Sequence, residues 1–251
     1  AKFGVCKVTI SSHLKQIGKS RKLDRWVPHD LSDRQKRVRL EACLSLLSRQ
    51  KSEPFLHRLV TCDEKWIHFD NRKRSYQWLD KSEPPKPTPK PDPHQRKTMV
   101  SVWWSSAGVI HYSFTRPGQA ITAEAYCQQL EEMMEKLAVM QPRMINRDRP
   151  LLLQDNARPH VANSTLLKLQ DLDLETLVHP PYSPDLSPTD YHFFQALDHF
   201  LQGKLFNSYD DVESAFHDFI ASRSPDFYRD GINKLPLKWQ RCVDNLGSYF
   251  D

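Results

Sequence analysis

Apolar residues recur at helical spacing in several parts of this 251-residue chain. The segment between residues 122 and 140 predicts a helix, with an apolar face made of Tyr126, Leu130, Met133 and Leu137. Similar spacing predicts helices over about 160–170, 188–202, 209–222 and 235–246. Nearer the N-terminus, Ser32 and Gln35 form the S-x-x-Q pattern of a capping box, which predicts a helix from there to about Ser48.

Runs rich in β-branched and aromatic residues predict strands between these helices. The first run covers residues 57–70, and a hairpin follows with strands at 98–104 and 109–114. A short apolar strand, Leu151–Leu153, and another at 174–178 alternate with later helices. Three strands, a helix and then alternating strands and helices are typical of an α/β fold whose mixed sheet has helices on both faces. This order matches a ribonuclease H-like fold.

A proline-rich segment at residues 71–97 interrupts the predicted sheet. Proline stands at alternate positions from Pro85 to Pro93, which favours a stiff, extended polyproline II path. A loop of this length inside a compact domain is usually functional or disordered. We expect an arm that reaches a neighbouring subunit or DNA, and an SH3-like partner is the alternative.

The composition is that of an ordinary globular protein, with 39% hydrophobic and 27% charged residues. No stretch approaches the roughly eighteen apolar residues of a membrane span, and the N-terminus lacks the apolar core of a signal peptide. The five cysteines are scattered and form no C-x-x-C pair. This pattern argues against disulfides and structural zinc, and it favours a reducing intracellular compartment.

The formal net charge of +5 is unevenly distributed along the chain. Residues 1–50 hold 12 Lys and Arg against 4 Asp and Glu, whereas the rest of the chain holds 24 against 27. A basic N-terminal part joined to a slightly acidic body indicates that the first meets a polyanion and the second holds metal-binding carboxylates. A solvated basic face is the alternative that charge alone leaves open.

The N-terminal residues have the pattern of the last part of a helix-turn-helix. A turn around Gly4 precedes a helix with Val8, Ile10 and Leu14 on one side, as in a recognition helix that reads DNA. The polar and basic residues predicted to contact DNA are Ser11, Ser12, Lys15, Lys19, Arg21, Lys22 and Arg25. Because the two preceding helices are absent, we expect a fragment cut inside a DNA-binding module. A short basic amphipathic helix without a special role is the alternative.

Three aspartates lie in segments whose local structure the sequence predicts: Asp63 in LVTCDEKW, Asp155 in LLLQDNARPH and Asp190 in YSPDLSPTDYHFF. Asp63 lies within a predicted strand, where a charged residue needs a partner. Asp155 follows a buried strand, at the edge where open α/β sheets place their ligands. Pleat alternation puts Glu64 on the face opposite to Asp63. The structural alternatives are that Asp63 pairs with Lys65 or an arginine, and that Asp155 caps the following helix.

Asp190 has the strongest structural alternative. With Ser187 it satisfies the S-x-x-[DE] pattern of a capping box, with proline at the first helical position. Read alone, Asp190 is better explained by that role. Asp185 lies five residues earlier and competes with it for any functional role.

Convergence of the three carboxylates would change this assessment. Two carboxylates about 4 Å apart repel by roughly 4 kcal/mol at an effective dielectric of 20. A divalent cation makes such a cluster tolerable. All-oxygen ligands point to Mg²⁺, with Mn²⁺ as a substitute. Two such ions per site suit phosphodiester chemistry, where they flank the attacking and leaving oxygens.

Several motifs, in order, resemble those of the mariner transposases of the ribonuclease H-like superfamily. WVPHDL at 26–31 resembles the family's linker motif, usually WVPHEL. TCDEKW, QDNARPH and YSPDLSPTDYH resemble its three catalytic blocks, and the gap of thirty-four residues between Asp155 and Asp190 is the mariner spacing. The resemblance runs from about Val8 to Phe250, and Asp30 departs from it in place of glutamate.

The resemblance implies a Mg²⁺-dependent, nuclear DNA transposase that cuts transposon ends and joins the freed 3′-hydroxyl to TA target DNA. Asp63, Asp155 and Asp190 are then the catalytic metal ligands, with Asp190 rather than Asp185 as the third. No covalent protein intermediate is needed, and we expect no small-molecule cofactor. Two further candidates for supporting the ligands or contacting DNA are Asn156 and His160.

The resemblance also implies a homodimer. The residues of the linker that would assemble the pair are Trp26, Val27, Pro28 and His29. The proline-rich arm at 71–97 would clasp the partner subunit. We therefore expect a helix-turn-helix remnant at 1–24, a linker and connecting helix at 25–56, and a ribonuclease H-like catalytic domain at 57–251.

Two other functions stay open. A mariner copy recruited by a host as a DNA-binding or regulatory module would keep the fold with little catalysis. A structure-specific nuclease of the same fold would cut branched or flap DNA without a preference for transposon ends.

Overall fold

The structure is a computed structural model that describes residues 16, 27–72, 95–116 and 118–250. The chain divides into two compact units, Ala1–Asp30 and Leu31–Asp251. Only residues 16 and 27–30 of the first unit are described. The sheet and the helices that pack on it belong to the second unit.

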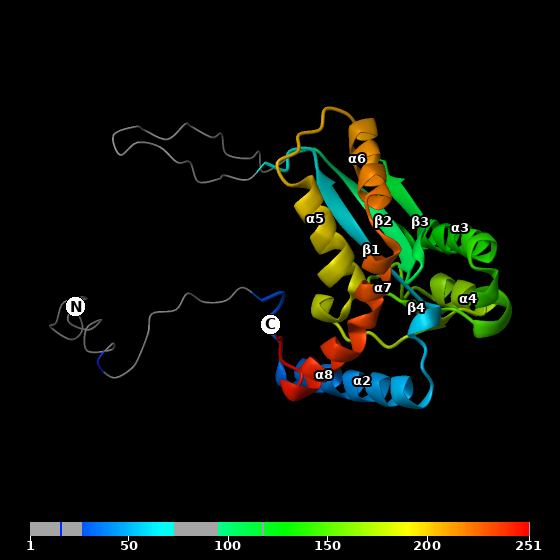
Figure 1. Ribbon diagram of the computed structural model, residues 1–251, viewed down its shortest axis with the longest axis vertical. Helices are drawn as coiled ribbons and strands as arrows, with labels where there is room; N and C mark the ends of the chain where they lie inside the picture. The colour runs from blue at the N-terminus through cyan, green and yellow to red at the C-terminus, as the bar shows by residue number, and fades with distance from the viewer. Residues whose placement is uncertain (1–15, 17–26, 73–94, 117, 251) are drawn as a thin grey trace. The chain divides into compact units, whose positions relative to one another are not determined.

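The sheet has five strands in the order β3-β2-β1-β4-β5 (Figure 1). The antiparallel strands are β1 (Leu59–His68), β2 (Lys97–Ser105) and β3 (Gly108–Thr115). On the other side of β1, β4 (Leu151–Leu153) and β5 (Glu175–Thr176) add two parallel strands. The predicted mixed sheet and hairpin are confirmed.

Apolar side chains cover both faces of this sheet. Trp103 and Trp104 are neighbours on β2 and point to opposite faces, and both are fully buried. Trp103 belongs to the cluster formed with α3 (Ala123–Met140) and α4 (Asn163–Asp171). Trp104 belongs to the larger cluster formed with α2 (Asp33–Ser52) and the C-terminal helices. Figure 1 shows α3 and α4 on one side of the sheet and α5 (Gln195–Leu201), α6 (Tyr209–Ala221) and α7 (Pro225–Asn233) on the other.

Helix α2 (Asp33–Ser52) begins at the predicted capping box. The Gln35 N–H donates to Ser32 Oγ at 3.3 Å, and the Ser32 N–H donates to Gln35 Oε1 at 2.8 Å. The helix packs along α8 (Leu235–Asp244), as Figure 1 also shows. The capping prediction is therefore confirmed.

The C-terminal part differs from the prediction in two places. The helix expected at 188–202 is divided into a π-helix, η4 (Thr189–Phe194), and α5 (Gln195–Leu201). After α6 (Tyr209–Ala221), the structure adds α7 (Pro225–Asn233), which the sequence did not predict. Gly231 within α7 weakens the local helical pattern. A Cβ at Gly231 would lie 2.4 Å from His192 Cδ2 and 2.9 Å from Trp104 Cη2, so tertiary packing selects glycine there.

Three boundaries also moved. The strand expected at 57–70 is preceded by a 3-10 helix, η1 (Leu56–Arg58), and the strand expected at 174–178 is reduced to β5. Helix α4 begins at Asn163 rather than near 160, because the Ala157 carbonyl accepts the His160 N–H in a turn. Two further short helices are η2 (Met144–Asp148) and η3 (Pro184–Leu186).

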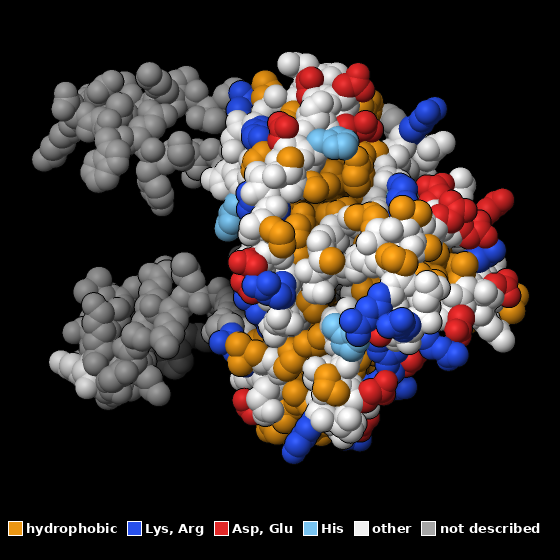
Figure 2. All heavy atoms as spheres, turned by 45° about the vertical axis from the view of Figure 1, so that its right-hand side comes forward, with side chains coloured by type: hydrophobic (Ala, Val, Ile, Leu, Met, Phe, Trp, Pro, Cys, Tyr) orange, Lys and Arg blue, Asp and Glu red, His pale blue; other side chains and the backbone are white. Residues whose placement is uncertain are grey.

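Figure 2 shows charged side chains of both signs spread over one face, with hydrophobic side chains gathered across its middle. Among the described helices, none combines the length and the apolar character that a bilayer crossing requires. The four cysteines in the described chain, Cys43, Cys62, Cys127 and Cys242, are free thiols.

Candidate active site

The three aspartates singled out from the sequence line one cleft of about 590 Å³. Asp63 lies midway along β1, Asp155 stands two positions after β4, and Asp190 is the second residue of η4. Because β1 and β4 are neighbouring parallel strands, the chain carries Asp63 and Asp155 toward the same end of the sheet. Residues 156–157 and 179–184 complete the lining.

Asp63 lies near other acidic groups. Its Oδ1 accepts a hydrogen bond from the Glu64 backbone N–H at 2.7 Å. Lys65, considered above as a partner of Asp63, binds Asp198 at 3.0 Å instead. Burial raises the pKa of Asp63 well above its usual range, and the negative charges of Asp190 and Glu64 raise it further.

The start of η4 fixes the position of Asp190. Its N–H donates to the carbonyl of Ser187 at 3.1 Å and to the Ser187 hydroxyl at 3.3 Å, as in one half of a capping box. Next to it, Thr189 Oγ1 accepts a hydrogen bond from Trp104 Nε1 and shares one with Thr61 Oγ1, both at 3.1 Å. These contacts tie the helix start to β1 and β2 and leave the carboxylate at the cleft.

Asp63 and Asp190 lie close enough to influence each other's pKa. Burial raises the pKa of Asp190, and hydrogen bonds with Asp63 and Ser187 offset only part of this effect. Both carboxyls of the pair therefore have raised pKa values. Two such neighbours are most stable with a proton or a cation between them.

Asp155 begins a tight turn instead of capping a helix. Its Oδ1 accepts the Ala157 N–H at 2.9 Å and lies 2.7 Å from His160 Nδ1. The cap position of α4 is Ala162, so the capping alternative for Asp155 is wrong. Partial burial opposes ionisation, but the hydrogen bonds from His160 and Ala157 outweigh it and lower the pKa of Asp155.

His160 joins two acidic residues beneath the cleft. Its side chain is buried, with Nδ1 on Asp155 and Nε2 3.2 Å from Glu64 Oε1. The ring packs on Tyr126 at 4.2 Å between centroids. Burial opposes a positive charge here, but the two carboxylates outweigh it and raise the pKa of His160 to about 10. Sequence reasoning placed Glu64 on the opposite face of β1 and so missed that it reaches Asp155 through His160.

Asn156 connects the two sides of the cleft. Its Nδ2 donates to the His179 carbonyl at 2.8 Å, and both residues belong to the lining. The contact holds the turn after β4 against the proline-rich turn at 179–184. Asn156 thus shapes the cleft, as His160 does from below.

Asp185 is bound away from the cleft. Both of its oxygens accept hydrogen bonds from Arg39, at 2.8 and 2.6 Å. Asp185 and Asp190 both border a neighbouring groove, but only Asp190 also lines the cleft. Sequence reasoning did not find the Arg39 contact, because the partners lie 146 positions apart.

The donor set of the cleft suits a hard divalent cation. Carboxylate oxygens are the ligands that Mg²⁺ and Mn²⁺ prefer, and the raised pKa values of Asp63 and Asp190 mark negative charge that a cation would relieve. In the described part of the chain, no three Asp, Glu, His or Cys side chains stand together closely enough to hold an ion as they are placed. The chemical type of the donor atoms therefore suits such a cation. Small side-chain movements would have to bring the three carboxylates onto one ion.

Most of the residues predicted to contact DNA or a second subunit lie outside the part of the chain that the structure describes. The residues outside the described chain are Ser11, Ser12, Lys15, Lys19, Arg21, Lys22, Arg25 and Trp26. Of the linker, Val27 and Pro28 are exposed and His29 is half-buried. Of the predicted arm, only residues 71–72 and 95–97 are described.

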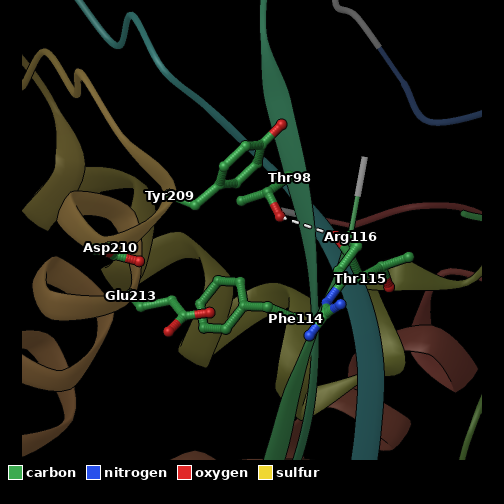
Figure 3. Close-up of a pocket in the computed structure, with 7 residues that line it drawn as sticks. All are labelled: Thr98, Phe114, Thr115, Arg116, Tyr209, Asp210 and Glu213. Carbon is green, nitrogen blue, oxygen red and sulfur yellow. Dashed lines mark hydrogen bonds between the residues drawn. The ribbon is translucent and has the colours of Figure 1, made fainter. Parts of the chain in front are cut away.

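A separate pocket of about 490 Å³ lies between the β2–β3 hairpin and the start of α6 (Figure 3). Asp210 and Glu213 face it from α6, and Arg116 faces it from the end of the hairpin. Thr98 Oγ1 donates to the Thr115 carbonyl at 3.1 Å within the sheet. The pocket holds none of the predicted site residues, so the cleft with the three aspartates is the stronger candidate for chemistry.

Comparisons with known proteins show what the chain is similar to. Residues 68–147 match a family model described as "Transposase (partial DDE domain)". The chain is 58% identical over 243 residues to "Histone-lysine N-methyltransferase SETMAR" of Homo sapiens, and the match covers 97% of this chain and 36% of that protein. It is 40% identical over 248 residues to "Mariner Mos1 transposase" of Drosophila mauritiana, covering 98% of this chain and 72% of that protein.

Solved structures of a relative have the same fold. The chain matches the Mos1 transposase paired-end complex with left transposon end, and Mos1 paired-end complexes with Mn and with Mg. Each match has a TM-score of 0.91 at 40% identity and covers 100% of this chain and 73% of the other. The ribonuclease H-like fold predicted from the order of strands and helices is confirmed.

Proposed function

The chain belongs to the mariner family of DNA transposases, and on that basis we propose that it cuts transposon ends and joins the freed 3′-hydroxyl to target DNA. The observation that carries the proposal is the position of Asp63, Asp155 and Asp190 around one cleft. The chain spans 36% of the human relative and 72% of the Drosophila relative. The activity of the whole protein is therefore part of the proposal.

The three aspartates are the proposed ligands of Mg²⁺, or of Mn²⁺ in its place. The oxygen donors support this choice, as do the solved complexes of Mos1 with each of the two metals. When bound, two such ions supply an activated water or hydroxyl nucleophile and stabilise the leaving 3′ oxygen. The resulting reaction needs no covalent intermediate on the protein.

The residues around the ligands prepare them for this role. His160 fixes one oxygen of Asp155, so that the carboxylate does not swing freely. Ser187 fixes the backbone of Asp190, and Asn156 holds the wall at His179. Orientation before metal or substrate binds lowers the cost of assembling a reactive geometry.

The partners of this proposed enzyme are DNA and a second copy of the chain. Transposon ends are part of the complexes solved for Mos1, and the basic first fifty residues of this chain suit a polyanion. The linker at 26–31 and the arm at 71–97 are the segments proposed to assemble the dimer. TA dinucleotides are the proposed target and the nucleus the proposed compartment, since the substrate is chromosomal DNA.

The first experiment measures Mg²⁺- or Mn²⁺-dependent joining of a pre-cut transposon-end duplex to a plasmid that contains TA sites. We expect joining by the parent chain and none by Asp155→Ala or Asp190→Ala. Asp198→Ala is the matched control, because Asp198 is an exposed acid bound to Lys65 beside the cleft. Normal joining by either cleft variant would contradict the proposal.

A second candidate is a DNA-binding module of a larger host protein. The finding that favours it is the 58% identity to a human protein of which the chain spans 36%. In that case DNA binding would fall steeply with salt, because phosphate contacts release counterions, and Mg²⁺ or Mn²⁺ would produce no cleavage. Binding without joining, in the assay above, would decide for this candidate.

A further inference from the structure

A fully buried arginine joins three distant parts of the chain beside the cleft. Arg39 of α2 is 0% exposed. Its Nε donates to the Gly247 carbonyl at 2.8 Å, and its Nη1 donates to Ser183 Oγ at 2.6 Å. Its two terminal nitrogens also grip both oxygens of Asp185, the geometry in which arginine binds a carboxylate most strongly.

The Arg39 contacts fix the short helix that leads to Asp190. Helix η3 (Pro184–Leu186) contains Asp185 and closes on Ser187, whose N–H donates to the first carbonyl of η3 at 3.2 Å. The carbonyl and hydroxyl of Ser187 then accept the N–H of Asp190. The guanidinium and the backbone of Asp190 are therefore linked by two sets of hydrogen bonds, which the backbone of η3 connects.

The ion pair holds one of two nearby carboxylates. Asp185 and Asp190 lie five residues apart and both border the neighbouring groove, but only Asp190 also joins Asp63 in the lining of the cleft. The Asp185 side chain is 14% exposed, so without Arg39 it would be a nearly buried carboxylate without its cation. Buried ion pairs contribute little net stability compared with apolar packing, although losing one partner is costly. Stability alone is thus a weak reason for an arginine at this position.

We infer that Arg39 is a positioning residue for the metal site: it holds Asp185 out of the cleft and thereby leaves Asp190 as the third ligand. The inference rests on the proposed function, because it concerns one of the proposed metal ligands. It adds a role for α2, which carries no residue of the cleft itself.

The test measures Mn²⁺ binding to the full chain, from the electron paramagnetic resonance signal of free Mn²⁺. We expect Arg39→Met to weaken binding about tenfold or more, as loss of a residue supporting a ligand usually does. Arg39→Lys keeps the charge but not the forked guanidinium that fits both oxygens. The Mn²⁺ affinity of Arg39→Lys should therefore lie between those of the parent and Arg39→Met. Asp185→Asn in the Arg39→Met background should recover part of the affinity, because the competing carboxylate is removed.

Arg49 provides a matched control on the same helix. It binds both oxygens of Glu175, at 2.5 and 3.0 Å, but the pair lies at the surface. Arg49→Met should keep Mn²⁺ affinity within about twofold of the parent, since exposed ion pairs contribute little. Thermal unfolding of each variant shows whether the protein used in the binding measurement is folded.

The outcomes separate the inference from the proposed function. If folded Arg39→Met or Arg39→Lys binds Mn²⁺ as tightly as the parent, the inference is overturned. Arg39 would then have a structural role only. Failure of Asp185→Asn to recover any affinity would overturn the competition between the two carboxylates. If Arg39→Met does not fold, Arg39→Lys decides by the same criterion. Absence of Mn²⁺ binding by the parent chain would overturn the proposed function, and the inference with it.

Discussion

The Nδ1 atom of His160 lies 2.7 Å from Oδ1 of Asp155 and so fixes the orientation of that carboxylate. The other ring nitrogen lies 3.2 Å from Oε1 of Glu64, a residue that is not part of the lining of the cleft. With a pKa of about 10, His160 carries a positive charge at neutral pH. One buried ring thus orients a proposed ligand and reduces the net negative charge beneath it.

Replacement of His160 by alanine should therefore impair the metal site. We expect His160→Ala to lower Mg²⁺-dependent nicking by about 10- to 100-fold, the usual range for a residue that orients a metal ligand. Steady-state nicking of plasmid DNA measures this. His199→Ala, at an exposed histidine of α5, is the control and should match the parent. Equal rates for both variants would contradict the role of His160.

Removal of one cleft carboxylate should stabilise the metal-free protein. Asp63 has a pKa raised by burial and then by Asp190 and Glu64, so its ionised form is unfavourable in the fold. We expect Asp63→Asn at pH 8 with a chelator to raise the free energy of unfolding by about 1 kcal/mol. That change corresponds to roughly 2–4 °C in Tm.

Thermal unfolding with and without Mg²⁺ checks this expectation. Mg²⁺ should raise the Tm of the parent more than that of Asp63→Asn, while nicking by the variant is lost. Functional sites commonly hold like charges close together, and this lowers the stability of the fold. A lower Tm for metal-free Asp63→Asn would show that Asp63 is a structural residue.

The sequence predicted those parts of the site that local pattern encodes. Asp63 lies within a predicted strand, Asp155 follows the end of another, and Asp190 lies in a capping pattern. Each of these patterns can be recognised from neighbouring residues alone. The contact of Arg39 with Asp185 spans 146 positions and leaves no periodic trace in the chain. No local pattern contains it, so only the tertiary structure reveals it.

Two other differences have similar physical causes. Pleat alternation correctly places Glu64 opposite Asp63, but it does not indicate that His160 bridges the distance to Asp155. Helix α7 was missed because Gly231 lowers its local helical propensity, whereas packing against His192 requires the glycine. The predictions for the N-terminal DNA contacts and for the arm stay predictions.

Acid should destabilise the fold through His111. This residue of β3 is 3% exposed, packs on Trp103 and lies 2.6 Å from Lys136 Nζ. Burial, and then the charge of Lys136, lower its pKa from 6.5 to about 4. Between these two values the unfolded chain binds more protons than the folded one, so stability falls as the pH falls through this window.

Urea unfolding of the metal-free chain between pH 7 and pH 4 measures the effect. We expect His111 to account for up to about 3 kcal/mol of the loss, and His111→Gln to lose correspondingly less. His57→Gln, at an exposed histidine of η1, is the control for the substitution itself. Identical pH profiles for the parent and His111→Gln would contradict the assignment.

Gly231 should tolerate no side chain, although it lies within a helix. Glycine to alanine at an exposed helical site would stabilise by about 1 kcal/mol. Here the new Cβ would lie 2.4 Å from the His192 ring and 2.9 Å from Trp104. The His192 ring cannot yield easily, because its Nε2 donates to the Phe227 carbonyl at 2.7 Å. We expect Gly231→Ala to destabilise the fold by about 1–3 kcal/mol, the usual cost of overpacking.

Chemical unfolding measures this change, and a double variant tests its cause. His192→Ala removes the nearer obstacle, so the double variant should be less destabilised than the sum of the two single changes. The same overpacking should reach the cleft, because Trp104 Nε1 donates to Thr189, the residue before Asp190. Nicking by Gly231→Ala should therefore fall below the parent rate even when the variant is fully folded. Full activity with reduced stability would confine the effect of Gly231 to the packing of α7.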